Sequence, residues 1–297
     1  MSKLNKVYFT PYRVSTITCN ADIGENININ LLVLYENINI CENTDNNFIW
    51  IQYLKENLEG TKGVNPKKKR NVKKNKNKKN RFDNQLTVIY RFNENYRPNI
   101  KIFKNGNIQL TGIRNKSDAE PIILKIIDEI KNIAKINDDI LINSSIDNLK
   151  YNNFIIRMIN TDFKVYINEK MTEKYLIRRK ILHKLLISDL YNNKCSFQPG
   201  IYHGVKLEFF WNSTKLHNDG ICNCANHCFG KSNGESVNNC KKITIALFES
   251  GSILITGGVS FNQIDDAYNY ICSILEKHEE EIRKSIIIAM DDETLIS

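Results

Sequence analysis

The chain has 297 residues, 41% of them hydrophobic, which is enough for one large domain or two modest ones with a true core. It has no run of about 18 apolar residues, so no transmembrane helix is expected, and its first residues, MSKLNKVYFTPYRVST, lack the apolar region of a signal peptide. We therefore expect an intracellular protein without a membrane partner, whose eight cysteines are free or metal-bound rather than paired as disulfides.

The net charge of +9 comes from one segment. The run KKKRNVKKNKNKKNR, residues 67–81, contains ten Lys or Arg and no acid, so the rest of the chain has a net charge of −1. Three interpretations stay open for this run. It can be a solvated loop without a further role, it can add phosphate contacts to a nucleic-acid site, or its KKKR sequence can act as a nuclear import signal.

The first half of the chain predicts short strands followed by a helix. YRVSTIT (12–18) and LTVIYRF (86–92) are typical of strands, and IKIFKNGNIQLTG (100–112) is typical of a hairpin. Pro121 suits the first turn of a helix. The apolar stripe behind it consists of Ile122, Ile123, Ile126, Ile127, Ile130 and Ile133.

The second half repeats this order. FIIRMIN (154–160) and GVKLEFFW (204–211) are typical of strands, and IALFESGSILITG (245–257) is typical of a hairpin. Thr172 is placed to cap a helix over residues 171–188. The apolar residues of that helix are Tyr175, Leu176, Leu182, Leu185 and Leu186. The stripe of a closing helix consists of Ile264, Tyr268, Ile271 and Leu275.

A single offset of 145 residues superimposes the two hairpins. The identities are Phe103 with Phe248, Gly106 with Gly251, Thr111 with Thr256 and Gly112 with Gly257. The same offset places Val14 and Thr16 on Ile159 and Thr161. An offset that works near both ends of each half predicts an internal duplication.

The predicted fold is therefore α+β, with two repeats whose helices cover one face of an antiparallel sheet. The first repeat takes residues 1–145 and carries the Lys-rich insertion 67–81. The second takes residues 146–285 and carries a Cys-rich insertion, 212–242, and an acidic tail, 286–297, follows it. Both insertions fall between strands, where added loop length costs little free energy.

The two faces of each hairpin differ in chemistry. Lys104-Asn105-Gly106 and Glu249-Ser250-Gly251 each fit a three-residue turn with glycine third, and the strand period of two then assigns the faces. The face expected under the helices has Ile100, Ile102, Ile108 and Leu110, and Ile245, Leu247, Ile253 and Ile255. The opposite face, called the open face below, is expected to be small, polar and isolated-aromatic in character. It has Asn99, Lys101, Phe103, Asn107, Gln109 and Thr111, and Thr244, Ala246, Phe248, Ser252, Leu254 and Thr256.

Phe103 and Phe248 are large aromatic residues on an otherwise polar face. A single such residue can simply be exposed, or covered by a loop. Two of them at equivalent positions favour a functional interpretation, because paired aromatic wedges suit a surface that inserts between stacked bases.

The duplicated motif Phe-x-x-Gly-x-x-x-x-Thr-Gly, FKNGNIQLTG and FESGSILITG, resembles the paired hairpins of the TATA-box-binding protein (TBP) family. FQPGIYHGVKLEF (197–209) and VSTI after Tyr12 are similar to other segments of that family, and the similarity covers nearly all the chain outside the insertions and the tail. The Lys- and Asn-rich sequence resembles divergent members from large DNA viruses. The resemblance implies a pseudo-symmetric saddle whose concave open face binds the minor groove of double-stranded DNA and bends it with aromatic wedges.

The resemblance also implies individual DNA-contacting residues. Phe103 and Phe248 match one wedge of each repeat, and Tyr202 matches the second wedge of the second repeat. The first-repeat counterpart of Tyr202 is Phe82 if FDNQL matches YHGVK, whereas strict spacing selects Leu86. The other positions that match groove-lining residues are Thr111, Thr256, Val14, Gln109 and Leu254.

The chain also departs from the family pattern. Lys101, Gln109 and Asn99 make the open face of the first repeat more polar, which predicts a weaker A·T preference, because minor-groove readout is degenerate to begin with. The asparagines that the family has at the centre of its opening strands have no clear counterpart, and Tyr12 and Arg157 are nearest.

The second insertion contains a dense group of cysteines. CNCANHC and a later cysteine supply four thiols, together with His227; the thiols are Cys222, Cys224, Cys228 and Cys240. Four thiolates can hold a structural zinc ion tetrahedrally, and the alternative is a loop with free thiols. No carboxylate stands near them as a general base, which argues against a catalytic zinc, and no other cofactor is expected.

These features predict a TBP-like transcription-initiation factor, not an enzyme, that binds and bends promoter DNA, A·T-rich by resemblance. Its expected partners are general transcription factors and the RNA polymerase machinery, in a nucleus or a cytoplasmic viral factory, with packaging in the virion as a further option. No nucleophile–base set, phosphate-cradling glycine loop or pair of carboxylates supports catalysis. The alternatives are a protein-interaction or structural module of the same fold and, more remotely, a subunit of a nucleic-acid enzyme that grips the substrate.

Overall fold

The structure is a computed structural model of the chain, and it describes residues 7–42, 44–55, 58–66, 85–226 and 228–284. The Lys-rich run 67–81, Phe82, His227 and the acidic tail 286–297 lie outside the described residues, so the predictions made for them stay predictions. Among the described helices, none is both long and apolar enough to cross a membrane.

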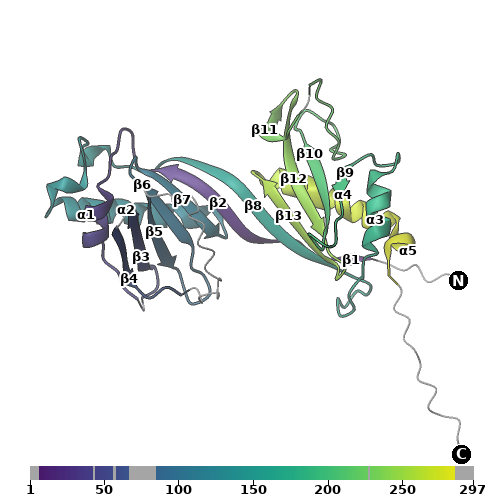
Figure 1. Cartoon of the computed structure of the whole chain (residues 1–297), viewed down its shortest axis with the longest axis horizontal. Coiled ribbons are helices and arrows are strands. Elements are labelled where there is room, and N and C mark those ends of the chain that lie inside the picture. The colour runs from purple at the N-terminus through teal and green to yellow at the C-terminus, as the bar shows by residue number, and fades with distance from the viewer. Residues whose placement is uncertain (1–6, 43, 56–57, 67–84, 227, 285–297) are drawn as a thin grey trace, which may run out of the picture. The chain divides into compact units, whose positions relative to one another are not determined.

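The chain divides into two compact units, which are described separately (Figure 1). Unit 1 consists of Met1–Val14 and Ile159–Ser297, and unit 2 consists of Ser15–Met158. The units are therefore not contiguous in sequence, because the first 14 residues fold with the second half of the chain. The repeat boundary predicted at 145/146 concerns sequence similarity rather than compactness, and it stays a prediction.

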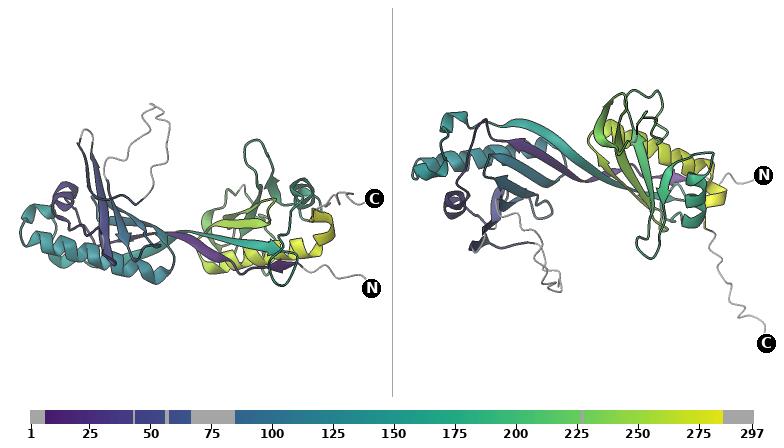
Figure 2. Two further views of the ribbon diagram at one scale, coloured as in Figure 1. Left: turned by 90° about the horizontal axis from the view of Figure 1, so that it is seen from below. Right: turned by 45° about the horizontal axis from the view of Figure 1, so that its top comes forward.

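Unit 2 contains an antiparallel sheet in the order β4-β3-β5-β6-β7-β2. Its strands are β2 (Arg13–Asp22), β3 (Asn47–Lys55), β4 (Leu58–Gly63), β5 (Gln85–Arg91), β6 (Asn99–Phe103) and β7 (Asn107–Ile113). Ile100, Ile102 and Leu110 are fully buried on one face. Helices α1 (Leu31–Asn37) and α2 (Ala119–Ala134) cover this face (Figure 2).

The isoleucine stripe predicted after Pro121 is confirmed, because all six isoleucines of α2 are buried and Pro121 lies in the first turn. Three short 3-10 helices flank this helix and lead into β8 (Asn152–Tyr166); they are Lys116–Asp118, Asp138–Ile140 and Ile146–Asn148. The buried residues of α2 and the sheet residues beneath them form the core of unit 2. The helices do not cover the other face of the hairpin, which is the predicted open face.

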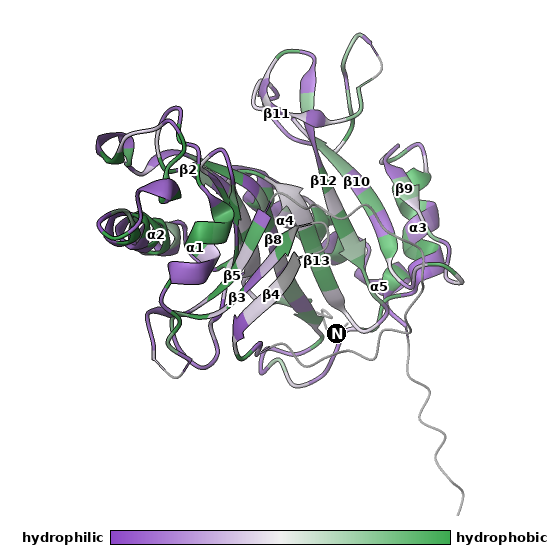
Figure 3. Cartoon of the chain, turned by 60° about the vertical axis from the view of Figure 1, so that its left-hand side comes forward, coloured by the Kyte–Doolittle hydropathy of each residue, from purple (hydrophilic) through white to green (hydrophobic). Residues whose placement is uncertain are grey.

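Unit 1 contains strands in the order β8-β13-β12-β10-β9, with β1 paired to β8 and β11 paired to β12. These strands are β1 (Tyr8–Phe9), β9 (Lys194–Ser196), β10 (Val205–Trp211), β11 (Lys231–Ser236), β12 (Asn239–Leu247) and β13 (Ser252–Gly258). The helices are α3 (Arg179–Ile187), α4 (Phe261–Lys277) and α5 (Glu279–Ile282). Hydrophobic and hydrophilic residues mix along the strands (Figure 3). Phe209 and Ile245 are fully buried, and the centroid of the Phe209 ring lies 5.2 Å from that of Tyr270 in α4.

Each hairpin contains two glycines with positive φ, one in its turn and one at a β-bulge. Gly106 (φ +78°) and Gly251 (φ +75°) end the three-residue turns, so the predicted turns are confirmed. Gly112 (φ +92°) and Gly257 (φ +98°) are skipped by the strand register, so each Thr-Gly pair contains a β-bulge. The pairs that flank the bulges are Thr18 with Thr111, Ile17 with Ile113, Asn160 with Thr256 and Ile159 with Gly258.

This register corrects the predicted alignment of the two opening strands. Thr18 and Asn160 each face the threonine before a bulge, so the opening strands are offset by 142 residues and not by 145. Val14 and Thr16 therefore do not match Ile159 and Thr161. The segments between the opening strand and the hairpin differ in length between the halves, so the hairpin offset does not carry over to the opening strand.

The helix predicted over residues 171–188 is shorter than expected. Helix α3 begins at Arg179, and Thr172 lies in the irregular segment before it and caps no helix. The Tyr175 N–H donates instead to the Val165 carbonyl (3.1 Å), and the Tyr175 side chain is fully buried. Burial of this aromatic ring outweighs the helical spacing of the segment. The predicted fold class, α+β with two repeats and helices on one face of antiparallel strands, is confirmed.

Candidate nucleic-acid interface

The open face of unit 1 is made of alternate residues of β8, β9, β10, β12 and β13. Its paired residues are Lys206 with Ala246, Glu208 with Thr244, Ala246 with Leu254, and Thr244 with Thr256. The residues between them along the strands are buried under the helices. The predicted assignment of faces is confirmed for this hairpin.

Tyr202 and Phe248 lie side by side at one end of this face. Their ring centroids are 5.7 Å apart, with ring planes at 58°. A Cβ on Gly204 would come within 2.9 Å of the Tyr202 ring and 3.2 Å of the Phe248 ring, so glycine allows the two rings to approach. Lys206 Nζ lies 4.0 Å from the centre of the Tyr202 ring, a favourable cation–π distance. The structure thus brings two of the predicted wedge residues together.

Arg179 holds the loop that carries Tyr202 against the turn of the hairpin. Its guanidinium lies 2.6 Å from Glu249 Oε2 and also donates to the His203 carbonyl. Lys284 Nζ lies 2.7 Å from the other Glu249 oxygen, and the two cations, Lys284 first, lower the pKa of Glu249. The aromatic pair is therefore positioned by ion pairs outside the sheet, which the sequence did not predict.

An acidic residue, Glu208, lies in the same open face between two lysines. Its carboxylate oxygens are 3.0 Å from Lys194 Nζ and 3.2 Å from Lys242 Nζ. Burial alone would raise the pKa of Glu208, but the hydrogen bonds from Lys194 and Lys242 outweigh it and lower the pKa. The three side chains together carry a charge of +1, so this part of the face stays cationic.

The open face of unit 2 has the same register and more polar residues. Its pairs are Gln85 with Phe103, Thr87 with Lys101, Lys101 with Gln109, Asn99 with Thr111, and Thr111 with Thr18. Thr111 is exposed, whereas Lys101, Phe103 and Gln109 are half-buried. The predicted face of this hairpin is confirmed, and it offers amide, hydroxyl and ammonium groups around one aromatic ring.

The second aromatic of unit 2 is not identified. Phe82 lies outside the described residues, so its assignment stays a prediction. The alternative, Leu86, is wrong because this residue pairs with Ile102 and is fully buried under the helices. By register Leu86 matches Val205.

One end of the unit 2 open face is apolar and buried. Ile89 pairs with Asn99 and with Trp50, so both apolar side chains belong to this face. Ile89 is 1% exposed and Trp50 is 7% exposed, and they cluster with Ile49. The prediction of a uniformly polar or isolated-aromatic face is therefore wrong at this end, where the strand positions carry a small second core.

The register also reveals face residues that the sequence did not. Asn160 pairs with Thr256, so an asparagine does lie in an opening strand, and Thr18 is its counterpart in unit 2. The Thr-Gly pair of each hairpin was the sequence signal, because the residue opposite its threonine in the opening strand can be counted from the bulge. Tyr12, by contrast, donates from its hydroxyl to Asp265 of α4 (2.6 Å), and burial together with this carboxylate raises its pKa to about 12.

Val14 lies at the start of β2 and is half-buried. Strand alternation places it on the same side of β2 as Thr16 and Thr18, the residue opposite Thr111. Its predicted side of the strand is therefore the open one, and its contact with DNA stays a prediction.

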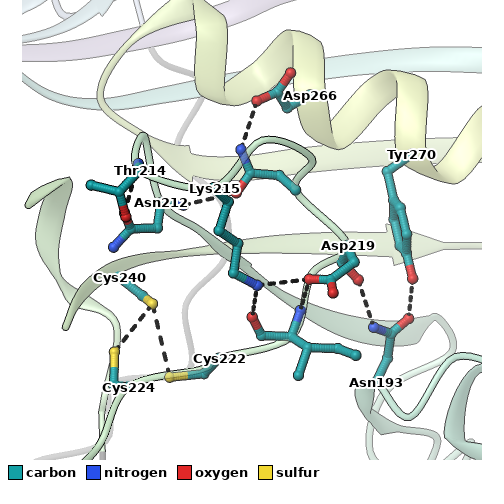
Figure 4. A network of polar contacts seen from close by, with 12 residues as sticks. Asn193, Asn212, Thr214, Lys215, Asp219, Cys222, Cys224, Cys240, Asp266 and Tyr270 are labelled. Atoms are coloured by element: carbon teal, nitrogen blue, oxygen red, sulfur yellow. Dashed lines mark hydrogen bonds and ion pairs between the residues drawn. The ribbon is translucent and has the colours of Figure 1, made fainter. Parts of the chain in front are cut away.

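The four cysteines of the insertion come together in unit 1. The sulfur atoms of Cys222, Cys224, Cys228 and Cys240 all lie within 4.8 Å of one another, an arrangement that can hold a metal ion. Figure 4 shows three of them, those of Cys222, Cys224 and Cys240. Burial would raise the pKa of Cys228, but the N–H groups of Gly230 and Cys240 that bond its sulfur help to lower it. Outside the cluster, burial raises the pKa of the Cys19, Cys195 and Cys272 thiols to about 12.

Comparison with known proteins supports the predicted resemblance. No protein-family model matches the chain. The chain is 28% identical over 280 residues to a curated protein named TATA-box-binding protein-like from Acanthamoeba polyphaga mimivirus. This alignment covers 91% of the chain and 66% of the relative, so the chain spans just under two thirds of the relative's length.

Among solved structures, the chain is similar to Methanococcus jannaschii TBP, with a TM-score of 0.44, 17% identity, and coverage of 91% of this chain and 99% of that one. The resemblance predicted from the duplicated hairpins is confirmed by the viral relative: over most of its length, this chain is similar to a viral TATA-box-binding protein-like protein.

Proposed function

We propose that the chain is a TBP-like transcription-initiation factor, without catalytic activity, whose open faces bind the minor groove of promoter DNA and bend it. The observation that carries this proposal is the pair of half-buried rings, Tyr202 and Phe248, on a polar sheet face. Phe103 occupies the position of Phe248 in the other repeat.

The aromatic pair is suited to insert between adjacent base pairs. Unstacking one base step costs on the order of a few kcal/mol, which the buried ring surface and added contacts of a bent duplex can offset. Gly204 and the Arg179–Glu249 ion pair hold the rings in place before DNA arrives, so little side-chain entropy is lost on binding. Lys206, above Tyr202, adds a cation where the phosphate backbone would approach.

The centres of the faces fit the minor groove in a second way. Thr18 faces Thr111 in unit 2, and Asn160 faces Thr256 in unit 1, so small hydroxyl and amide groups line the open strands. Such groups can donate to the base-edge acceptors that A·T and T·A pairs share, which favours A·T-rich sites but distinguishes sequences weakly.

We propose accessory roles for the two insertions. The lysines of residues 67–81 add phosphate contacts, and a structural zinc ion at the four cysteines stabilises unit 1 without contacting DNA. Recruitment of general transcription factors and RNA polymerase, in a nucleus or a viral factory, follows the family resemblance and belongs to the same proposal.

The test is DNA bending measured by energy transfer between dyes at the two ends of an A·T-rich duplex. Phe103→Ala combined with Phe248→Ala should abolish bending while binding at low salt persists through the lysines. Phe261→Ala is the matched control, because Phe261 is an exposed aromatic on helix α4 and not on the open face. Bending that survives the double substitution would refute the wedge assignment.

One observation favours a second function, a protein-interaction module. Glu208 places a carboxylate in the open face of unit 1, where it would oppose DNA phosphates if its two lysines were drawn away. A gel shift that finds no binding to A·T-rich or G·C-rich duplexes at low salt, with folded wild-type protein, would support the module and exclude the DNA proposal.

A further inference from the structure

The Cys-rich insertion (212–242) is fixed to helix α4 on one side. The Asp266 carboxylate accepts hydrogen bonds from Trp211 Nε1 (2.6 Å) and from Asn218 Nδ2 (3.1 Å). Further along, Gln263 Nε2 donates to the Asn233 carbonyl (2.7 Å). The helix therefore holds the insertion at two points, before and after the cysteine-rich segment.

A second network orders the residues that lead into the first cysteine (Figure 4). Lys215 Nζ lies 2.8 Å from Asp219 Oδ1 and donates to the Ile221 carbonyl (2.5 Å). Asn193 Nδ2 donates to the Asp219 carbonyl (3.1 Å) and is itself held by the Tyr270 hydroxyl (2.6 Å to Asn193 Oδ1). Ile221 therefore has a defined position, and so does the residue after it, Cys222.

The insertion also lies against the sheet, through glycines in the left-handed region. The Gly220 carbonyl (φ +77°) accepts from the Phe210 N–H (3.0 Å), and the Gly230 carbonyl (φ +65°) accepts from the Lys242 N–H (2.8 Å). A Cβ on Gly230 would lie 2.4 Å from Lys242 Cβ, so the chain passes too close for any larger residue. These bonds bring the segment 220–230 to the ends of β10 and β12.

The four sulfurs meet where the segment 220–230 reaches β12. Cys240 is a residue of β12 and is 2% exposed, whereas Cys222, Cys224 and Cys228 come from the loop and are half-buried. The Cys240 sulfur is 3.4 Å from that of Cys224 and 3.8 Å from that of Cys222. A tetrahedral zinc ion with Zn–S bonds of about 2.3 Å requires sulfurs separated by about 3.8 Å. The observed spacing is that of a metal site.

Alternative uses of these thiols fit less well. A disulfide needs sulfurs about 2.05 Å apart and joins two of them, whereas the Cys240 sulfur lies at similar distances from two partners. The Gly230 N–H donates to the Cys228 sulfur (3.4 Å), which helps to fix the position of this sulfur in the cluster.

We propose that Cys222, Cys224, Cys228 and Cys240 bind one Zn²⁺ through four thiolates, and that the ion clips the insertion to β12 so that it covers Phe210. Phe210 is on the open-face side of β10 and is only 5% exposed, with Gly220, Ile221 and Cys222 beside it in a cavity of about 500 Å³. Four protein ligands leave no position for water or substrate, so the ion is structural. This site would exist whether or not the chain binds DNA.

The first test is metal content. Full-length protein prepared with Zn²⁺ under reducing conditions and then desalted should retain about one zinc per chain by mass spectrometry. Replacing the four cysteines by serine should reduce this to near zero, and Co²⁺ in place of Zn²⁺ should show the visible bands of a tetrahedral thiolate complex. Cys195→Ser with Cys272→Ser is the matched control, since these half-buried thiols of unit 1 lie outside the cluster.

The second test needs no cysteine variant, so it holds even if those variants fail to fold. In a Trp50→Phe background, Trp211 is the one remaining tryptophan, and it packs against Gly234 of the insertion. Chelation should change its fluorescence, and adding Zn²⁺ should reverse the change with saturation at about one equivalent. Bound zinc should also protect four of the eight cysteines from alkylation.

Each result decides the proposal. Folded wild-type protein that retains no Zn²⁺ and gives no Trp211 response would overturn it, and so would zinc that persists after all four cysteines are replaced. Loss of zinc in the control variant would show that the wrong thiols had been assigned. A protein that binds zinc but no DNA would overturn the proposed DNA function and leave the metal site intact.

Discussion

The open faces of unit 1 and unit 2 share a strand register but differ in chemistry. At the centre of the unit 1 face Ala246 pairs with Leu254, and at the matching positions of unit 2 Lys101 pairs with Gln109. Unit 1 also has two aromatic rings in contact, whereas only one aromatic, Phe103, is described at that end of unit 2.

A comparison of the two halves shows at which positions of the duplicated sequence the fold requires a particular type of residue. The turn glycines, the bulge glycines and the apolar residues under the helices are retained in both halves. The open-face residues at the centre of the hairpins, Lys101 and Gln109 in unit 2 and Ala246 and Leu254 in unit 1, differ while the residues under the helices stay apolar. If both faces contact DNA, unit 1 should contribute apolar contacts and unit 2 polar ones.

The largest expected effect concerns the two turn glycines. A Cβ on Gly251 would lie 2.4 Å from the Tyr175 carbonyl oxygen, which is fixed backbone, whereas on Gly106 it would meet the Ile27 side chain at 3.0 Å. Gly251→Ala should destabilise unit 1 by about 3 kcal/mol, and Gly106→Ala should destabilise unit 2 by about 1–2 kcal/mol.

Each unit contains one of the two tryptophans, so urea unfolding can be followed separately in single-tryptophan backgrounds, by Trp211 in Trp50→Phe protein for unit 1 and by Trp50 in Trp211→Phe protein for unit 2. Gly200→Ala is the control, because nothing lies within 4 Å of a Cβ there. Equal losses at the two turns would show that the hairpins are supported alike and would remove this difference between the units.

The next effect separates the aromatic residues. Phe248→Ala removes one ring of the Tyr202–Phe248 pair and should weaken DNA binding by about 2 kcal/mol, close to 30-fold, with most of the bending lost. Phe103→Ala should cost less, about 1 kcal/mol, because polar neighbours on that face keep their contacts. Affinity measured by fluorescence anisotropy decides the order, and a larger loss for Phe103→Ala would reverse the assignment of the stronger wedge to unit 1.

The features that occur in both halves of the chain could be predicted from the sequence. The identity between the hairpins, with glycine third in each turn, correctly predicted the turns, the core face and the fold class, because strand alternation and turn geometry are local rules. It failed where long-range packing decides. Tyr175 has helical spacing with its neighbours but is drawn into the core, so α3 starts late.

The rest of the candidate site depended on pairing that no local rule specifies. The offset of the opening strands required the bulge at Gly112 and Gly257, and without it Asn160 was overlooked. Strands β3 and β4 were not predicted, so the apolar contact of Trp50 with Ile89 on the open face could not be foreseen. The cysteine cluster was visible in the sequence, but its attachment to β12 was not.

A smaller effect tests whether the centre of each face sets base preference. Lys101→Ala with Gln109→Leu gives unit 2 the residues of unit 1. Losing one cation should lower the salt slope of binding by about one. The ratio of A·T-rich to G·C-rich affinity should rise by about fivefold, or about 1 kcal/mol, because apolar contacts suit a groove floor without the guanine amino group. An unchanged ratio would mean that the difference between the faces has no role in readout.

The smallest effect concerns Glu208, which stands where unit 2 has buried Ile89. Glu208→Gln removes a negative charge from the open face and frees Lys194 and Lys242 for phosphate, so DNA affinity should rise about threefold. Stability should change in the opposite direction. The two lysines lower the pKa of Glu208 in the folded state, so its contribution is present above the ordinary carboxyl pKa and is lost as the pH falls through the lowered value.

The variant should therefore be less stable than wild type by about 0.5 kcal/mol at neutral pH, and the two should converge in acid. In a Trp50→Phe background, Trp211 fluorescence in urea, measured at neutral and at acid pH, reports unit 1 alone. Trp50, followed in Trp211→Phe protein, should not respond to the substitution, because Glu208 belongs to unit 1 and Trp50 to unit 2. Weaker DNA binding by the variant would mean that the carboxylate positions the lysines rather than opposing the phosphates, and the second function, a protein-interaction module, would lose its only support.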